Sequence, residues 1–251
     1  MNRKTRNIAL LIGIPVLTLL LFVASTFYHE QKRVLRIQVK IEAEPDQCFL
    51  SVADINELLS LETRVLQQPV QAVDLQALEQ ELLATQYVDS AIAYFGTDGQ
   101  LMLQVQLRKP VARVLPNGMA GYYLDAEGHI IPLSTAYTAR VPLLTGNVPD
   151  LAHQPEADST LMTLVPMLHH IAEDEFWRAH ISELYRDRAG DLVLYPTLGE
   201  LRILFGAPYD YQKKLKHLLH FYQEVLSVRG WRYYKSIALK YDGQIVATKR
   251  S

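Results

Sequence analysis

The stretch from Ile8 to Phe27, IALLIGIPVLTLLLFVASTF, carries no charged side chain. At about 1.5 Å of rise per residue, a helix over this stretch would cover the roughly 30 Å hydrocarbon core of a bilayer. Arg3, Lys4 and Arg6 precede it, and the positive-inside rule places such basic flanks in the cytoplasm. The sequence therefore predicts a cytoplasmic tail over residues 1–7, a transmembrane helix over residues 8–27, and the remaining chain on the far side of the membrane.

A cleaved signal peptide is the alternative for this stretch. Signal peptides have apolar cores of roughly 7–15 residues, followed by an A-x-A-like cleavage site. The apolar run here is longer, and Val23-Ala24-Ser25 imitates that site poorly, so a retained anchor is favoured. A single uncharged span also argues against a channel or transporter, because these need several spans or polar groups within the membrane.

The composition is that of a folded protein without a basic excess. The chain has 251 residues, of which 49% are hydrophobic, and a formal net charge of −2. This length is enough for one or two domains with a core of their own. Nucleic acid is not expected as a partner, because no excess of basic side chains is available to neutralise phosphates.

The stretch from Val34 to Val114 predicts a module in the order strand, helix, helix, strand, strand. Its first strand, Val34 to Ile41, alternates apolar and polar side chains, which is typical of a strand with one buried face. Ser51 and Asp74 stand at N-cap positions ahead of two segments with apolar residues at helical spacing.

A hairpin closes this module. Ile92 and Tyr94 alternate with polar neighbours in its first strand, glycines 96 and 99 mark the turn, and Leu101 to Leu107 form the most regular alternation in the chain. Pro110 is expected to end this last strand or to place it near a sheet edge. Two helices and three strands that bury each other's apolar faces predict an α+β domain over residues 34–114.

Residues 115–251 predict a β-rich domain with two helices. The expected strands lie at residues 122–125, 129–133, 140–146, 181–186, 192–195, 200–205, 234–241 and 244–248. The first helix begins at Ser159, and Pro166 should kink it or delay its start. The second helix, Asp210 to Val228, has one apolar face. The basic stripe on its other face is expected to be solvated, with contact to anionic lipid or an acidic partner as the alternative; it consists of Lys213, Lys214 and Lys216.

Sequence signatures of catalysis are absent. No GxGxxG, Walker A, HExxH, GxSxG or SxxK motif occurs. His169 and His170 are adjacent, so on a helix they diverge by about 100° and cannot chelate one metal as an i, i+4 pair would. We expect one of them to face solvent and the other to be partly buried. The chain is therefore not expected to be an enzyme, or to bind a metal, a cofactor or a small-molecule substrate.

Several short motifs resemble one family. The segments VDLQALEQELLATQYVDSAIAYF and GQLMLQVQLRKPVARV resemble the second half of the POTRA module of the bacterial cell-division family FtsQ/DivIB, including the Lys109-Pro110-Val111-Ala112 close. The stretches YYLDAEGHIIPL, VPLLTG and KSIALKYDGQIVATK resemble motifs of that family's C-terminal domain. The resemblance runs from end to end of the chain, and it implies a POTRA-like domain over residues 34–114 and an FtsQ-type domain over residues 115–251.

This resemblance implies a non-enzymatic, single-span scaffold of the division machinery. It implies residence in the bacterial inner membrane at the division septum, with a cytoplasmic N-terminus and a periplasmic bulk. The implied partners are small single-span division proteins of the FtsB/FtsL type, and the implied role includes regulation of septal peptidoglycan synthesis.

Two other functions are weighed against this one. The first is a POTRA-containing protein of outer-membrane assembly or secretion, but the 251 − 114 = 137 residues after Val114 are too few for a barrel of roughly 16 strands with about 10 residues each. The second, a membrane-tethered envelope hydrolase, would need a catalytic pair that no motif reveals.

Strand addition to a sheet edge, or β-augmentation, is the expected route of partner binding. The candidate partner-binding residues are chosen by their position in the last strand pair; they are Ile237, Leu239, Lys240, Tyr241, Gly243, Ile245 and Val246. An ordinary edge strand without a partner is the alternative. Proline at Ile245 is expected to abolish the pairing while sparing the fold.

Overall fold

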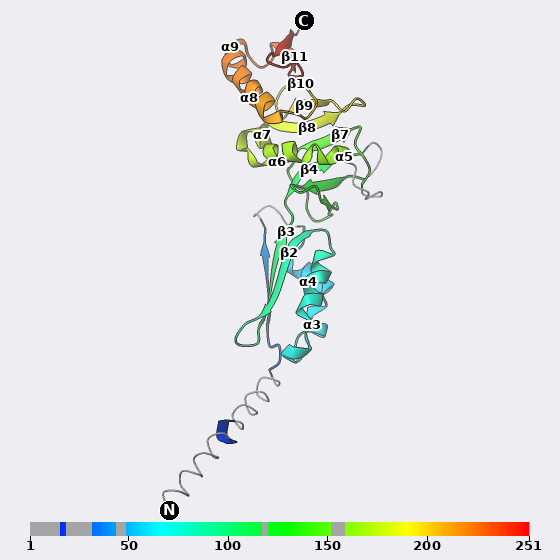
Figure 1. Ribbon diagram of the computed structural model, residues 1–251, viewed down its shortest axis with the longest axis vertical. Helices are drawn as coiled ribbons and strands as arrows, with labels where there is room; N and C mark the ends of the chain where they lie inside the picture. The colour runs from blue at the N-terminus through cyan, green and yellow to red at the C-terminus, as the bar shows by residue number, and fades with distance from the viewer. Residues whose placement is uncertain (1–15, 19–31, 44–48, 117–119, 152–158, 251) are drawn as a thin grey trace, which may run out of the picture. The chain divides into compact units, whose positions relative to one another are not determined.

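The computed structural model describes residues 16–18, 32–43, 49–116, 120–151 and 159–250 (Figure 1). The predicted membrane span lies outside these residues except for positions 16–18, which are helical. Among the residues described, no helix combines the length and the apolar character needed to cross a membrane. The chain forms two compact units: unit 1 ends at Leu107, and unit 2 begins at Arg108 and also takes in Ala43 and Phe49.

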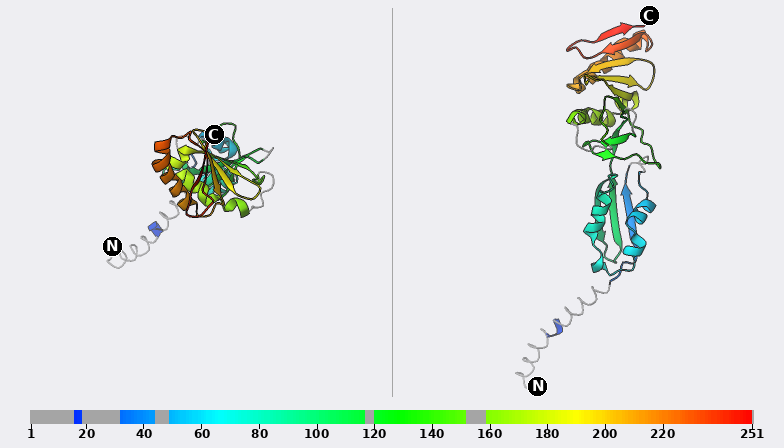
Figure 2. Two further views of the ribbon diagram at one scale, coloured as in Figure 1. Left: turned by 90° about the horizontal axis from the view of Figure 1, so that it is seen from above. Right: turned by 90° about the vertical axis from the view of Figure 1, so that its right-hand side faces the viewer.

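Unit 1 is a three-stranded sheet in the order β1-β3-β2, with α3 and α4 lying along one face of it (Figures 1 and 2). Its elements are β1 (Ile37–Glu42), α2 (Val52–Leu58), α3 (Leu61–Arg64), η1 (Val70–Ala72), α4 (Leu75–Leu83), β2 (Val88–Phe95) and β3 (Leu101–Leu107). Strand β1 pairs with β3 in parallel, and β2 pairs with β3 in antiparallel. The predicted order of strands and helices is therefore present within this unit.

Local sequence signals account for most of unit 1. Ser51 caps α2 in a full capping box with Asp54, and the Asp74 side chain accepts a hydrogen bond from the Ala77 N–H at the start of α4. The alternate residues of β3 from Leu101 to Leu107 are all buried against the helices. Caps and alternation thus fix both where the helices begin and which face of the sheet they cover.

Unit 2 is built on a nine-stranded sheet in the order β12-β11-β10-β9-β8-β7-β4-β5-β6. Its strands are β4 (Pro110–Val114), β5 (Tyr122–Asp125), β6 (Ile130–Ile131), β7 (Leu143–Gly146), β8 (Ile181–Arg186), β9 (Leu192–Pro196), β10 (Arg202–Gly206), β11 (Tyr234–Ala238) and β12 (Val246–Lys249). Its helices are α5 (Ser159–Met162), α6 (Val165–Glu173), α7 (Glu175–His180), α8 (Tyr211–Phe221), the π-helix η2 (Tyr222–Leu226) and α9 (Ser227–Arg229). Helices α6, α7 and α8 lie on the same side of the sheet (Figures 1 and 2).

The strand around Pro110 corrects the expected domain boundary. Residues 110–114, which the sequence assigns to the POTRA-like domain, instead form β4, an interior strand of the larger sheet. Strand β4 pairs with β5 in antiparallel and with β7 in parallel, and not with β3. Pro110 therefore starts a strand instead of ending one, and in the sequence only Arg108 and Lys109 lie between β3 and β4.

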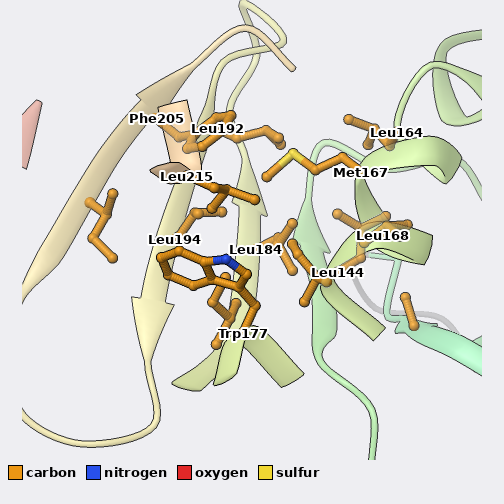
Figure 3. Packing of buried hydrophobic residues seen from close by; sticks show 14 of the residues in the cluster. Leu144, Leu164, Met167, Leu168, Trp177, Leu184, Leu192, Leu194, Phe205 and Leu215 are labelled. Carbon is orange, nitrogen blue, oxygen red and sulfur yellow. The ribbon is translucent and has the colours of Figure 1, made fainter. Parts of the chain in front are cut away.

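The core of unit 2 lies between its helices and one face of the sheet. Trp177 from α7, 4% exposed, packs among leucines of β7, β8 and β9, and Met167 and Leu168 of α6 enter the same cluster (Figure 3). Pro166 lies in the first turn of α6, where its missing N–H costs nothing. In place of one kinked or delayed helix, the structure has two, α5 from Ser159 and α6 from Val165. His169 is exposed and His170 is partly buried, also as predicted.

Candidate functional site

Strand β12 forms one end of the nine-stranded sheet, and within the described part of the chain it pairs only with β11. It spans four residues, Val246–Lys249, of which three are exposed and Ala247 is half-buried. Along a strand, the N–H and C=O groups of successive residues point alternately to the neighbouring strand on one side and on the other. The Arg250 N–H donates to the Tyr233 carbonyl of the chain leading into β11 at 3.0 Å, so the backbone groups of Ala247 and Lys249 face away from β11.

Two of the predicted site residues are interior. Ile237 is fully buried in β11, between Ile203 of β10 and Ala247 of β12. The Leu239 side chain is buried, and its N–H already donates to the Leu204 carbonyl at 2.9 Å. Neither residue has backbone groups free to accept another strand.

The other predicted residues lie in or beside the turn from β11 to β12. Lys240, Tyr241 and Gly243 are exposed in this turn, Ile245 is half-buried just before β12, and Val246 is the first residue of the free edge. The Lys240 ammonium lies 5.3 Å from the Tyr241 ring centroid, a cation–π contact. The sequence-based choice therefore identified the turn but missed Ala247 and Lys249, which present the outward backbone groups.

A row of in-register side chains leads across the sheet to Val246, on the face opposite the helix-packed core. Tyr185 pairs with Val193, Val193 with Leu204, Leu204 with Ala238, and Ala238 with Val246. Tyr185 and Val246, at the two ends of the row, are 40% and 45% exposed. A strand added beside β12 would place one of its own side chains next to Val246 and lengthen this apolar row.

Helix α8 contacts the β11–β12 turn through an ion pair. Lys213 forms an ion pair with Asp242 at 2.8 Å, and its hydrogen bond lowers the pKa of that carboxyl. Lys214 points inward, donates to the Phe205 and Ala207 carbonyls, and has its pKa lowered by burial. Of the predicted basic stripe, only Lys213 and Lys216 are therefore on the solvated face. Two adjoining cavities of about 210 and 300 Å³ lie between α8 and the turn.

Gly206 fixes how closely the turn approaches β10. Its φ of +75° suits glycine, and a Cβ atom there would lie 2.7 Å from the Cβ atom of Lys240. The position of the β11–β12 turn thus depends on the absence of a side chain at this one residue.

The edge and its approaches are basic. Six cationic residues lie between Ser227 and Arg250, against one acidic residue; they are Arg229, Arg232, Lys235, Lys240, Lys249 and Arg250, and the acidic one is Asp242. Glu200 neutralises Arg250 in part through an exposed ion pair at 2.6 Å.

The β2 and β6 edges are less open than that of β12. In unit 1, the Glu79 carboxylate accepts the Ala93 N–H of edge strand β2 at 2.7 Å and so blocks one of the groups a partner strand would use. At the far end of the large sheet, β6 spans only Ile130–Ile131.

A group of potential metal ligands lies in the turn between β5 and β6. Donor atoms of Asp125, Glu127 and His129 lie within 4.8 Å of one another. The Arg108 guanidinium, however, is 2.7 Å from the buried Asp125 carboxylate and 2.9 Å from the His129 ring. A cation already occupies the position that a metal would take, so we assign this group to the stability of the turn.

The half-buried imidazole of His180, the last residue of α7, contacts the π-helix. His180 Nε2 is 3.1 Å from the Tyr222 hydroxyl, and the Phe176 ring stacks on it. Burial lowers the pKa of His180 and raises that of Tyr222. The exposed Trp231 ring completes this cluster.

The two units match two known families. Residues 34–106 match the POTRA-like domain, and residues 109–248 match the family described as FtsQ/DivIB, C-terminal related. The fold is thus that of a POTRA-like domain followed by a second, sheet-rich domain. Because the second match covers more than half of the sequence, the chain belongs to the FtsQ/DivIB family.

One curated relative agrees with this assignment. The chain is 29% identical over 172 residues to the cell division protein FtsQ of Rhodothermus marinus. The aligned residues make up 66% of this chain and 62% of that protein. The match thus spans less than two thirds of the relative's length. Family membership supports a role in cell division, among proteins that are generally not enzymes.

Proposed function

We propose that this protein is a non-enzymatic membrane scaffold of the bacterial division machinery. On this proposal, Ile8 to Phe27 anchor it in the inner membrane with a cytoplasmic N-terminus, and both units lie in the periplasm at the septum. There it recruits small single-span partners of the FtsB/FtsL type and helps regulate septal peptidoglycan synthesis. Membership of the FtsQ/DivIB family supports the division role, and the uncharged apolar run supports the anchor.

The free edge of β12 is the observation that carries this proposal. Its outward N–H and C=O groups at Ala247 and Lys249 can pair with one further strand, and main-chain pairing of this kind is a common mode of peptide recognition. In contrast, the β2 edge is blocked in part by Glu79. The partner therefore binds as an additional strand beside β12 and contributes an apolar side chain next to Val246.

The charge of the edge indicates the chemistry of the partner. With six basic residues against one acidic residue between Ser227 and Arg250, two copies of this edge would repel each other if they paired. A strand with acidic residues would be attracted to the same edge. The charge thus favours an acidic partner over self-association.

Proline substitution tests strand addition directly. Ala247→Pro removes an N–H that faces away from β11, which an edge strand tolerates, and the ring also blocks the approach of a partner strand. We expect co-purification with the FtsB/FtsL-type partner to fall at least about ten-fold, the equivalent of roughly 1.4 kcal/mol. This position is a sharper probe than Ile245, which precedes the strand.

Thr248→Pro is the matched control. Its N–H faces β11, so this variant should lower the stability of unit 2, whereas Ala247→Pro should not. Wild-type partner recovery with Ala247→Pro would refute strand addition at this edge.

The septal location has a test of its own, with the protein tagged at its N-terminus in dividing cells. We expect a band at the constriction, and an even signal around the envelope would refute this location.

A further inference from the structure

Residues 32–34, which lead into unit 1, are hydrogen-bonded to two loops. The Lys32 carbonyl accepts the Val70 N–H at 2.9 Å, and the Val34 N–H donates to the Gln68 carbonyl at 2.9 Å. The Lys32 ammonium donates to the Thr97 carbonyl at 3.3 Å. These bonds hold the entering chain against the turn before η1 and against the loop between β2 and β3.

A cavity of about 440 Å³ opens between these loops and Lys32. Val70 and Phe95 give it apolar walls, and Lys32 is the one charged residue among the described residues that line it. Gly99 also lines the cavity, next to residues 32–34. Its φ is +79°, and a Cβ atom there would lie 3.3 Å from the Arg33 carbonyl oxygen. The volume falls within the range of about 300–1,000 Å³ that is usual for small-molecule sites.

The sequence places this cavity close to the membrane. Lys32 follows the predicted span, which ends at Phe27, by five residues, and so few residues reach at most about 18 Å when fully extended. The entering segment Lys32-Arg33-Val34-Leu35-Arg36 carries three basic side chains, and its Leu35 is 62% exposed. Basic residues beside an exposed apolar one are the composition that favours a lipid surface.

We propose that this cavity binds a phospholipid of the adjoining leaflet. The Lys32 ammonium has two donors beyond its bond to Thr97 and binds the lipid phosphate as a point charge. The walls formed by Val70 and Phe95 take up the apolar part next to the headgroup. The inference rests on the membrane anchor of the proposed function, and it makes unit 1 a lipid-contacting module whose position above the bilayer is set by the headgroup it holds.

Photo-crosslinking in a bilayer tests this site. The full chain is reconstituted in nanodiscs of phosphatidylcholine with a photoactivatable phosphatidylglycerol, and lipid adducts are mapped by mass spectrometry. We expect adducts on the peptides that contain Val70 and residues 95–99. Lys32→Gln should reduce these adducts about five-fold, as expected for one basic contact at a membrane surface. Lys40→Gln is the control, because Lys40 is exposed on β1 of the same unit and pairs with Glu42.

The outcomes separate this inference from the proposed function. Adducts on the span but none on the two loops would overturn the lipid site and leave the anchor standing. Failure of the chain to co-isolate with the nanodiscs would overturn both. Loss of the loop adducts on addition of inorganic phosphate would show that free phosphate takes the site, and would also overturn the proposal.

Discussion

Removing the Asp125 carboxylate should destabilise unit 2 far more than removing the corresponding carboxylate of Asp187. Each aspartate opens a hairpin turn and accepts two backbone N–H groups on its Oδ1 atom. Only Asp125, whose side chain is 2% exposed, also binds a guanidinium, that of Arg108 at 2.7 Å. Asp187 is half-buried and makes no ion pair with any residue in the described part of the chain.

The difference between these two turns gives the expected magnitude. Removing one partner of a buried ion pair costs about 3–5 kcal/mol. The lower end applies to Asp125→Ala, because the Arg108 side chain is 15% exposed and keeps some access to water. Asp187→Ala loses only hydrogen bonds within a half-exposed turn and should cost about 1 kcal/mol. The excess attributable to the ion pair is therefore about 2 kcal/mol.

Tryptophan fluorescence can measure this excess in the whole protein. Both tryptophans, Trp177 and Trp231, belong to unit 2, so their emission follows the unfolding of that unit in urea, with the chain held in mild detergent. Equal losses of unfolding free energy for Asp125→Ala and Asp187→Ala would refute the argument. Adding Arg108→Met to Asp125→Ala should recover part of the loss, because no charge is then left buried without a partner.

Three further perturbations have expected outcomes. Glu79→Ala should speed amide hydrogen exchange at Ala93 and promote association through β2, visible by light scattering, because the edge loses its carboxylate cap. Burial lowers the pKa of His180 in the folded state below its ordinary value of 6.5, so the unfolded chain takes up a proton more readily than the folded one. The folded state therefore loses stability as the pH falls through that value. The melting temperature of unit 2 should drop between about pH 7 and pH 5, and it should drop less in His180→Phe. Gly206→Ala should weaken partner binding by displacing the turn before β12, whereas Gly199→Ala, with a similar φ and open space around its Cβ position, should leave the affinity unchanged.

The parts of the fold that the sequence predicted are those set by local chemistry. The caps at Ser51 and Asp74 and the alternation from Leu101 to Leu107 each depend on residues a few positions apart. The π-helix from Tyr222 to Leu226 could not be predicted, because its apolar spacing is that of the α-helix before it. Strand β4 was misassigned for a related reason, since its partners β5 and β7 are chosen by tertiary packing and leave no mark next to Pro110.

The sequence predicted the turn that leads to the free edge of β12, but it did not predict which residues present the outward backbone groups. Ile237 is a predicted site residue because of its position in the last strand pair, but β11 lies between β10 and β12, and Ile237 is fully buried there. The edge strand itself has a weak pattern, with one large apolar residue, Val246, followed by Ala247, Thr248 and Lys249. A strand that must remain soluble while unpaired cannot be strongly apolar, and charged residues along it discourage pairing with the wrong chain. On the proposed function, the basic residues that discourage pairing with the wrong chain would also attract an acidic strand, so weak strand character and partner specificity would have a common physical origin.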